Sequence, residues 1–162
     1  PNRPKKLLLG GGVGMPPMIF LAEHLKGQAG LQPLVLLGSE VPFPFTQQPS
    51  KILLPGIPDG VIAAMPLLED WGVASRLASL QGYPGCHEGY ITDLARHWLD
   101  ALTSQERTEV SLTSTQRHTQ TGVISGHQTL DLDTQRIRKH LSEQEYHRLF
   151  LQDNTHHHQA RD

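Results

Sequence analysis

The sequence contains a single cysteine, Cys86, and no long run of apolar residues. One cysteine excludes a disulfide within the chain and any site in which several cysteines hold a metal or an iron–sulfur cluster. No stretch approaches the ~18 consecutive apolar residues of a membrane-spanning helix. The opening PNRPKKLLLGGG is broken by glycines too early for a secretory signal. We therefore expect a cytoplasmic protein that has no membrane partner.

Clustered positive charge is also lacking. The net charge is −2 and the basic residues are scattered, whereas a nucleic-acid-binding face needs them gathered together. Apolar residues make up 37% of the chain, and only 12 of them fall among the 52 residues 111–162, which hold seven of the ten histidines. We therefore expect residues 1–110 to form the folded domain, because they carry nearly all of the core-forming residues. Residues 111–162 should be a divergent, polar, His-rich tail, partly helical or disordered.

The start of the chain has the pattern of a βαβ unit. Lys5–Leu9 is a short apolar run typical of a buried parallel strand. A glycine-rich turn over Gly10–Pro17 follows it. Apolar residues then recur at helical spacing from about Pro16 until Gly27. Pro33–Gly38 reads as a second buried strand, and the two strands should be parallel.

The rest of the chain adds further elements. The pattern predicts a proline-rich loop over 40–60, a short strand over 61–65, a helix over 66–71, a strand over 75–80, a loop over 82–89 and an amphipathic helix over 91–102. Thr92 or Asp93 can cap the last of these helices. Beyond Ser111 only one more helix is suggested, through apolar residues between 137 and 150. We expect an α/β fold with an open, mainly parallel sheet and flanking helices.

The glycine turn is the main candidate site. Glycines without Cβ atoms allow a positive φ and the close approach of a ligand, and free amides at a helix start favour an anion such as a pyrophosphate. The spacing is not G-x-G-x-x-G, because Pro17 stands where the third glycine would be, and no Lys-Ser or Lys-Thr of a Walker loop follows. The alternative is a tight turn whose glycines serve only close packing.

Three motifs carry a resemblance to a known family. The stretches GGGVGMPPMIFLAEHL, PLVLLGSE and GYITDLARHWL resemble the nicotinamide-nucleotide domain of ferredoxin-reductase-type flavoproteins, in particular the electron-transfer subunit of dihydroorotate dehydrogenase. The similarity covers roughly residues 5–110 and implies that residues 1–110 form a nucleotide-binding α/β domain. In that family an FAD-binding barrel precedes the nucleotide domain, hydride passes between NAD(H) and flavin, and some members add a [2Fe-2S] cluster held by four cysteines.

The resemblance implies a nucleotide site in two parts. The turn would contact the pyrophosphate and the nicotinamide side through Gly11, Gly12, Val13, Gly14, Met15 and Pro16. The end of the second strand would lie near the adenosine, through Gly38, Ser39 and Glu40. A carboxylate at Glu40 can accept from ribose hydroxyls and repels a 2′-phosphate, which favours NAD over NADP. An exposed loop carboxylate without such a role is the alternative.

The sequence also departs from the family. No barrel precedes Lys5, SLTSTQRHTQTG stands after Val110 where a strand and a Cys-Gly-Pro motif would follow, and no cysteine quartet is present. We therefore expect an incomplete module that binds neither FAD nor an iron–sulfur cluster, does not turn over alone, and is one or more strands short. Residues from about 111 onward would be an altered reading or a natural divergent tail. An exposed sheet edge would allow a homodimer.

The remaining candidates have ordinary interpretations. Cys86 beside His87 is poorly placed for a nucleophile, although His87–Glu88 could touch a ligand or a flavin. His140, His147 and His156–His158 lack the rigid frame that a metal site needs, and Trp71 and Trp98 are expected in the core or at an interface. The expected partners are therefore a nicotinamide dinucleotide and a flavin domain or redox protein. A non-catalytic nucleotide- or anion-binding or oligomerising domain, and a truncated product without stable function, are the alternatives.

Overall fold

A computed structural model describes residues 3–114 and 129–130 of the chain. Its main feature is a six-stranded sheet in the order β6-β5-β2-β1-β7-β8, in which every neighbouring pair is parallel. The strands are β1 (Lys5–Gly11), β2 (Gln32–Gly38), β5 (Ala74–Ser79), β6 (His87–Glu88), β7 (Val110–Ser114) and β8 (Thr129–Leu130). The predicted open, parallel α/β sheet is confirmed.

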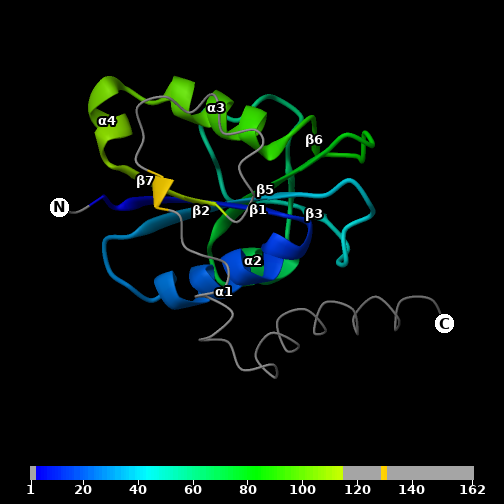
Figure 1. Ribbon diagram of the computed structural model, residues 1–162, viewed down its shortest axis with the longest axis horizontal. Coiled ribbons are helices and arrows are strands. Elements are labelled where there is room, and N and C mark those ends of the chain that lie inside the picture. The colour runs from blue at the N-terminus through cyan, green and yellow to red at the C-terminus, as the bar shows by residue number, and fades with distance from the viewer. Residues whose placement is uncertain (1–2, 115–128, 131–162) are drawn as a thin grey trace.

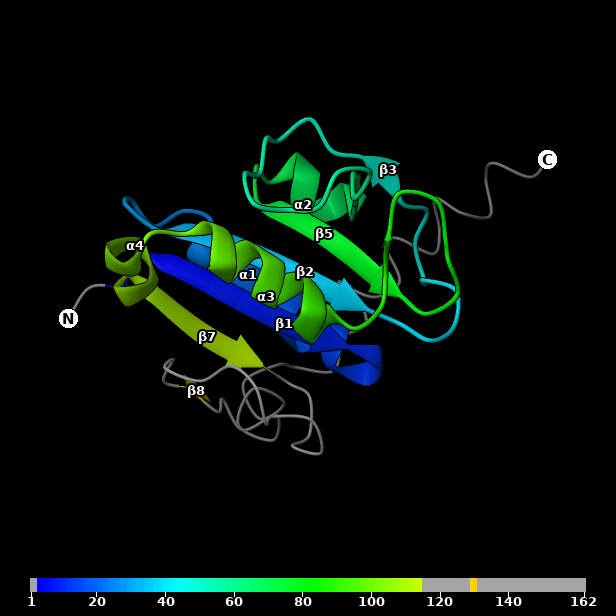
Figure 2. The same ribbon diagram turned by 90° about the horizontal axis from the view of Figure 1, so that it is seen from above.

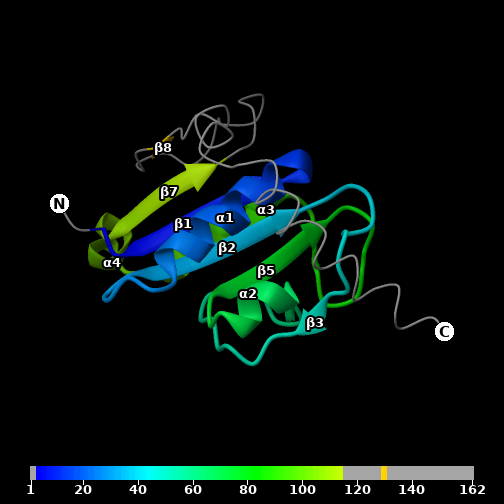
Figure 3. The same cartoon turned by 90° about the horizontal axis from the view of Figure 1, so that it is seen from below.

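Helices cover both faces of this sheet (Figure 1). Helices α1 (Met15–Leu25) and α2 (Pro66–Asp70) lie on one face, as Figure 3 shows. Helix α3 (Ile91–Ala101) crosses the other face, and the short α4 (Ser104–Thr108) follows it (Figure 2). A single 3₁₀ turn, η1 (Gly12–Gly14), joins β1 to α1.

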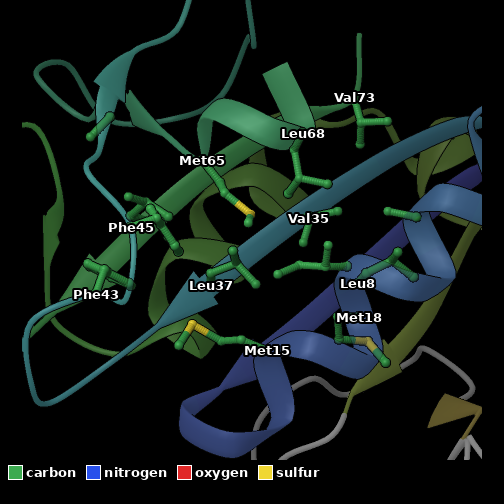
Figure 4. Packing of buried hydrophobic residues seen from close by; sticks show 14 residues of the cluster. Leu8, Met15, Met18, Val35, Leu37, Phe43, Phe45, Met65, Leu68 and Val73 are labelled. Atoms are coloured by element: carbon green, nitrogen blue, oxygen red, sulfur yellow. The ribbon is translucent and has the colours of Figure 1, made fainter. Parts of the chain in front are cut away.

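The two central strands are buried on both faces, which explains their unbroken apolar runs. Successive side chains of a strand point to opposite faces. In β1, Leu8 packs toward α1, while Leu7 and Leu9 pack toward α3. Val35 and Leu37 of β2 join the α1 side in the same way. Figure 4 shows this cluster, with α1 methionines packed against both strands.

Most of the predicted elements are present. The βαβ start, α2, β5 and α3 lie where the patterns placed them. Of the predicted strand over 61–65, only Ala63–Ala64 forms a strand, β4. It pairs antiparallel with β3 (Gln48–Pro49) in a separate two-stranded sheet. The segments predicted as loops contain β3 and β6, and α4 follows α3 where no helix was predicted.

The prediction that the strand after Val110 is missing is wrong. Val110–Ser114 forms β7 and pairs with β1 from Lys5 to Leu9. The sequence did not indicate this strand because Ser111 and Thr113 are polar. In the structure both are buried in the sheet alongside the apolar Leu112. The sheet therefore continues past residue 110, and the argument for a homodimer through a missing strand loses its premise. The expected helix over 137–150 and the histidines of the tail lie outside the described residues.

No helix in the described part of the chain is both long enough and apolar enough to cross a membrane.

Candidate functional site

The strand order reverses at β1. The chain moves from β1 to β2 and β5 on one side, and later returns to β7 on the other side of β1. The carboxyl ends of β1 and β7 are neighbours, since Leu9 is paired with Ser114. In open α/β sheets, ligands bind outside the carboxyl ends of the strands at such a reversal. The glycine turn begins at this point.

The outer side of the turn is open. Gly12 has a φ of +53°, and a Cβ added there would meet nothing within 4 Å. The Val13 side chain that follows is 78% exposed. A positive φ favours glycine over residues that carry a Cβ. The backbone at Gly12 therefore faces solvent in a conformation suited to glycine, with room for a ligand against it.

The inner side of the turn is closed by packing. A Cβ at Gly10 would lie 3.0 Å from the Gly14 carbonyl oxygen and 3.1 Å from Met18 Cγ. Gly14, Met15 and Pro16 are themselves buried. The packing interpretation of the glycines therefore holds at Gly10, where the absence of a side chain lets α1 approach β1, and does not account for Gly12.

Donors at this helix start come from the turn rather than from α1. Pro16 and Pro17 occupy the first turn of α1 and have no N–H. Met15 donates its N–H to the Gly12 carbonyl, and no side chain caps the helix at Gly14. No acidic side chain lies in the first turn of α1. An anion placed here would meet the amides of the glycine turn without a nearby carboxylate on the helix.

The second predicted segment lies at the same edge of the sheet. Gly11 is paired with Gly38, so residues 38–40 leave β2 beside the turn. Space above Gly38 is already filled, because a Cβ there would lie 2.7 Å from Ile91 Cγ2 of α3. The Ser39 N–H donates to the Ala78 carbonyl, and its hydroxyl accepts from Val41 N–H at 3.3 Å. Glu40 is exposed.

The start of α3 brings titratable groups to this edge as well. The N-cap residue of α3 is Tyr90, not Thr92 or Asp93 as predicted, but the Asp93 carboxylate in the first turn accepts from the Tyr90 N–H at 3.4 Å. The His87 and His97 rings lie 5.8 Å apart, centroid to centroid. Burial lowers the pKa of the His87 imidazole, His97 lowers it further, and the Asp93 carboxylate opposes both.

Cys86 is not set up as a nucleophile. The thiol is half-buried, and burial raises its pKa, which disfavours the reactive thiolate. Within residues 3–114 and 129–130, no group of three or more histidine, cysteine or acidic side chains is placed to hold a metal ion. Trp98 packs into the α3-side core and Trp71 packs against the α1-side core, as predicted.

Sequence reasoning missed a cavity of about 520 Å³ beside β4. Its walls come from the loop after β2, from β4 and from the loop after β5, including Phe43, Phe45 and Tyr83. Phe43 and Tyr83 are distant in the sequence, so no local pattern could join them. The only available signal was VPFPF, in which prolines separate two phenylalanines within a loop that was expected to be merely extended.

No protein-family model, curated protein or solved structure matches this chain.

Proposed function

We propose that this chain is the nicotinamide-nucleotide-binding module of an NAD(P)H–flavin electron-transfer oxidoreductase that works in the cytoplasm. One observation carries the proposal. The open glycine turn, in which Gly12 has a positive φ and an added Cβ would have no atom of the described residues within 4 Å, stands at the carboxyl end of the strand where the sheet order reverses. The motif resemblance supports it, since PLVLLGSE and GYITDLARHWL lead to the same edge of the sheet.

Each part of the edge has a role in this proposal. The turn amides would hold the pyrophosphate, and Glu40 would accept from a ribose hydroxyl. Bound NADH supplies a hydride, which needs an acceptor at roughly 3–3.5 Å from the nicotinamide. The flavin that accepts it would be held by a partner domain or protein, and any [2Fe-2S] cluster would also lie there. The role of this chain is to bind and orient the dinucleotide.

The test is calorimetric titration of NADH into the chain and into two matched variants. Gly12→Val places a branched side chain in the open space of the turn. Gly30→Val is the control, since Gly30 also has a positive φ and empty surroundings but precedes β2 at the opposite edge. Both substitutions place a residue that carries a Cβ at a positive φ, so the control includes the backbone cost of the change. We expect Gly12→Val to weaken NADH binding at least tenfold, about 1.4 kcal/mol, and Gly30→Val to leave it unchanged.

Equal NADH affinity in all three proteins would remove the turn as the nucleotide site. If inorganic pyrophosphate and ADP bound the turn as tightly as NADH, the result would favour the non-catalytic anion-binding alternative over a nicotinamide module. Thermal unfolding of both variants, followed by circular dichroism, shows whether each remains folded during the titration.

A further inference from the structure

We infer that the cavity beside β4 is a second small-molecule site, and that it takes an uncharged, planar aromatic ring. The inference does not rest on the proposed nucleotide function. β4 contacts β5, and Figure 2 shows its partner β3 on the outer side of β5, away from β1. The cavity therefore lies on the far side of β2 and β5 from the strand-order reversal.

The floor of the cavity is aromatic. The Phe43 and Phe45 ring centroids lie 5.2 Å apart at 31°, and those of Phe43 and Tyr83 lie 6.3 Å apart at 62°. These spacings fall in the range in which aromatic rings attract one another. A further ring entering the cavity can extend the same cluster, which makes a planar aromatic group the best-matched ligand.

The floor is also fixed before any ligand arrives. Phe43 and Phe45 are 6% and 2% exposed. Figure 4 shows them at one end of the α1-side core, near Leu37 and Met65. Rigid aromatic walls bind without a large ordering cost. The cavity is therefore preformed rather than opened by the ligand.

Backbone hydrogen bonds hold β4 and the loop after β5 together, and both segments line the cavity. The N–H groups of Ile62 and Ala63 both donate to the Gly85 carbonyl, at 3.0 and 2.9 Å, and Cys86 N–H donates to the Tyr83 carbonyl at 3.1 Å. A Cβ at Gly85 would lie 3.1 Å from Ala63 Cβ, so the loop after β5 packs directly on β4. This arrangement keeps Tyr83 in place.

The polarity of the lining selects a neutral ligand. Among the described residues that line the cavity none carries a charge, and the polar side chains are the neutral Thr46, Gln47, Gln48 and Tyr83. A charged group entering an apolar cavity without a partner would lose its hydration uncompensated. Amide side chains can both donate and accept, so they suit the polar edge of a heteroaromatic ring. The volume of about 520 Å³ lies within the usual range for small-molecule sites.

Indole and adenosine are suitable probes, because both carry a planar ring without charge. Each is titrated into the full chain by calorimetry, with ligand-observed NMR to detect weak binding. Ile62→Trp, at a half-exposed position on the rim, should fill the cavity and weaken both probes at least tenfold. Leu53→Trp is the control, because Leu53 is 92% exposed and lies outside the lining, and it should bind both probes as the wild type does.

A second variant, Tyr83→Ser, removes an aromatic wall without adding bulk and should also weaken the binding of both probes. The test therefore does not depend on whether the Ile62→Trp variant folds. Failure of the wild type to bind either probe would overturn the inference. Unchanged affinity in both Ile62→Trp and Tyr83→Ser would overturn it equally.

Competition with NADH identifies the source of the ring. Displacement of indole by NADH would mean that the cavity holds a base of the dinucleotide, and simultaneous binding would mean that it holds a free ring compound. Both results support the ring site. Gly12→Val should leave the indole affinity unchanged whatever it does to NADH, so failure of the nucleotide proposal and failure of the ring site give different results.

Discussion

Gly38 has no room for a side chain, because Ile91 Cγ2 would lie 2.7 Å from a Cβ added there. Gly38→Ala therefore forces α3 away from the sheet, and we expect a loss of about 1–3 kcal/mol in the free energy of unfolding. Urea denaturation measures it. In an Ile91→Ala background the same substitution should cost much less, since the opposing methyl is gone. Additive effects of the two substitutions would show that the contact is not the cause.

Glu40 sets the choice between NADH and NADPH if the turn binds a dinucleotide. Its carboxylate is exposed beside the edge at which β2 ends. Glu40→Gln should improve NADPH affinity relative to NADH by a factor of a few, because exposed charge interactions are worth up to about 1 kcal/mol. Titrations at low and high salt check this, since salt screens the effect. Asp70→Asn, before β5 at the opposite edge, should leave the ratio unchanged.

The free energy of unfolding should depend on pH through His87, which lies in β6 just before α3. Burial and His97 lower the pKa of His87 in the folded chain, so the unfolded chain binds the proton more readily. The stabilising contribution is complete above the ordinary histidine pKa of about 6.5, and is lost as the pH falls through the lower folded value. The free energy of unfolding should therefore decrease between pH 7.5 and pH 5 more in the wild type than in His87→Gln.

His24→Gln is the matched control for that measurement, because His24 is exposed on α1. Its pH profile should follow that of the wild type. Parallel profiles for His87→Gln and the wild type would show that the His87 imidazole of β6 does not couple to folding.

The loop between β3 and β4 is held in place by a buried arginine. Arg76 of β5 is 5% exposed and donates to the carbonyls of Val61 at 3.2 Å and Ile52 at 2.7 Å. Burial lowers its pKa and Glu69 opposes this, but a guanidinium remains charged in proteins. Glu69 in turn accepts from the Ser50 hydroxyl and from Lys51 N–H, both at 2.7 Å.

Arg76→Met should cost about 3 kcal/mol of unfolding free energy, because buried carbonyls lose a charged donor. Arg76→Lys should not restore the loss, since an ammonium cannot reproduce the planar fork. Guanidinium denaturation compares these with Arg96→Met, which lies exposed on α3 and should change stability by less than about 0.5 kcal/mol. Full stability in Arg76→Lys would mean that charge alone matters.

The stability of the whole domain should depend on β7, because this late strand pairs with β1 from the start of the chain. Leu112 of β7 is 2% exposed, is paired with Leu7 of β1 and packs in the α3-side core. Leu112→Ala should cost about 2–5 kcal/mol. Leu53→Ala, at a 92% exposed position, should be nearly neutral. Similar denaturation midpoints for both variants would show that β7 contributes little to stability.

The sequence was informative where a pattern is local. The apolar runs and the helical spacing of residues 15–25 predicted the central βαβ unit, and GGGVGMPP located the turn. It was uninformative in β7, where buried polar residues give the sequence the composition of a loop. It was also uninformative wherever contacts join segments that are distant in the chain. The open side of Gly12 and the filled space above Gly38 both depend on tertiary packing, so the sequence could not distinguish a glycine that faces open space from one that is packed against a helix.

The central position of β1 has a consequence for biosynthesis. One edge of β1 can pair with β2 once residue 38 has been made, but the other edge waits for β7, more than 70 residues later in the chain. During translation of that interval, β1 has unpaired amides and carbonyls along the side that later pairs with β7. Such an edge can recruit a strand from another chain. Ribosomes that stall between α1 and α4 would therefore carry nascent chains prone to associate, and release of the completed domain ends that exposure.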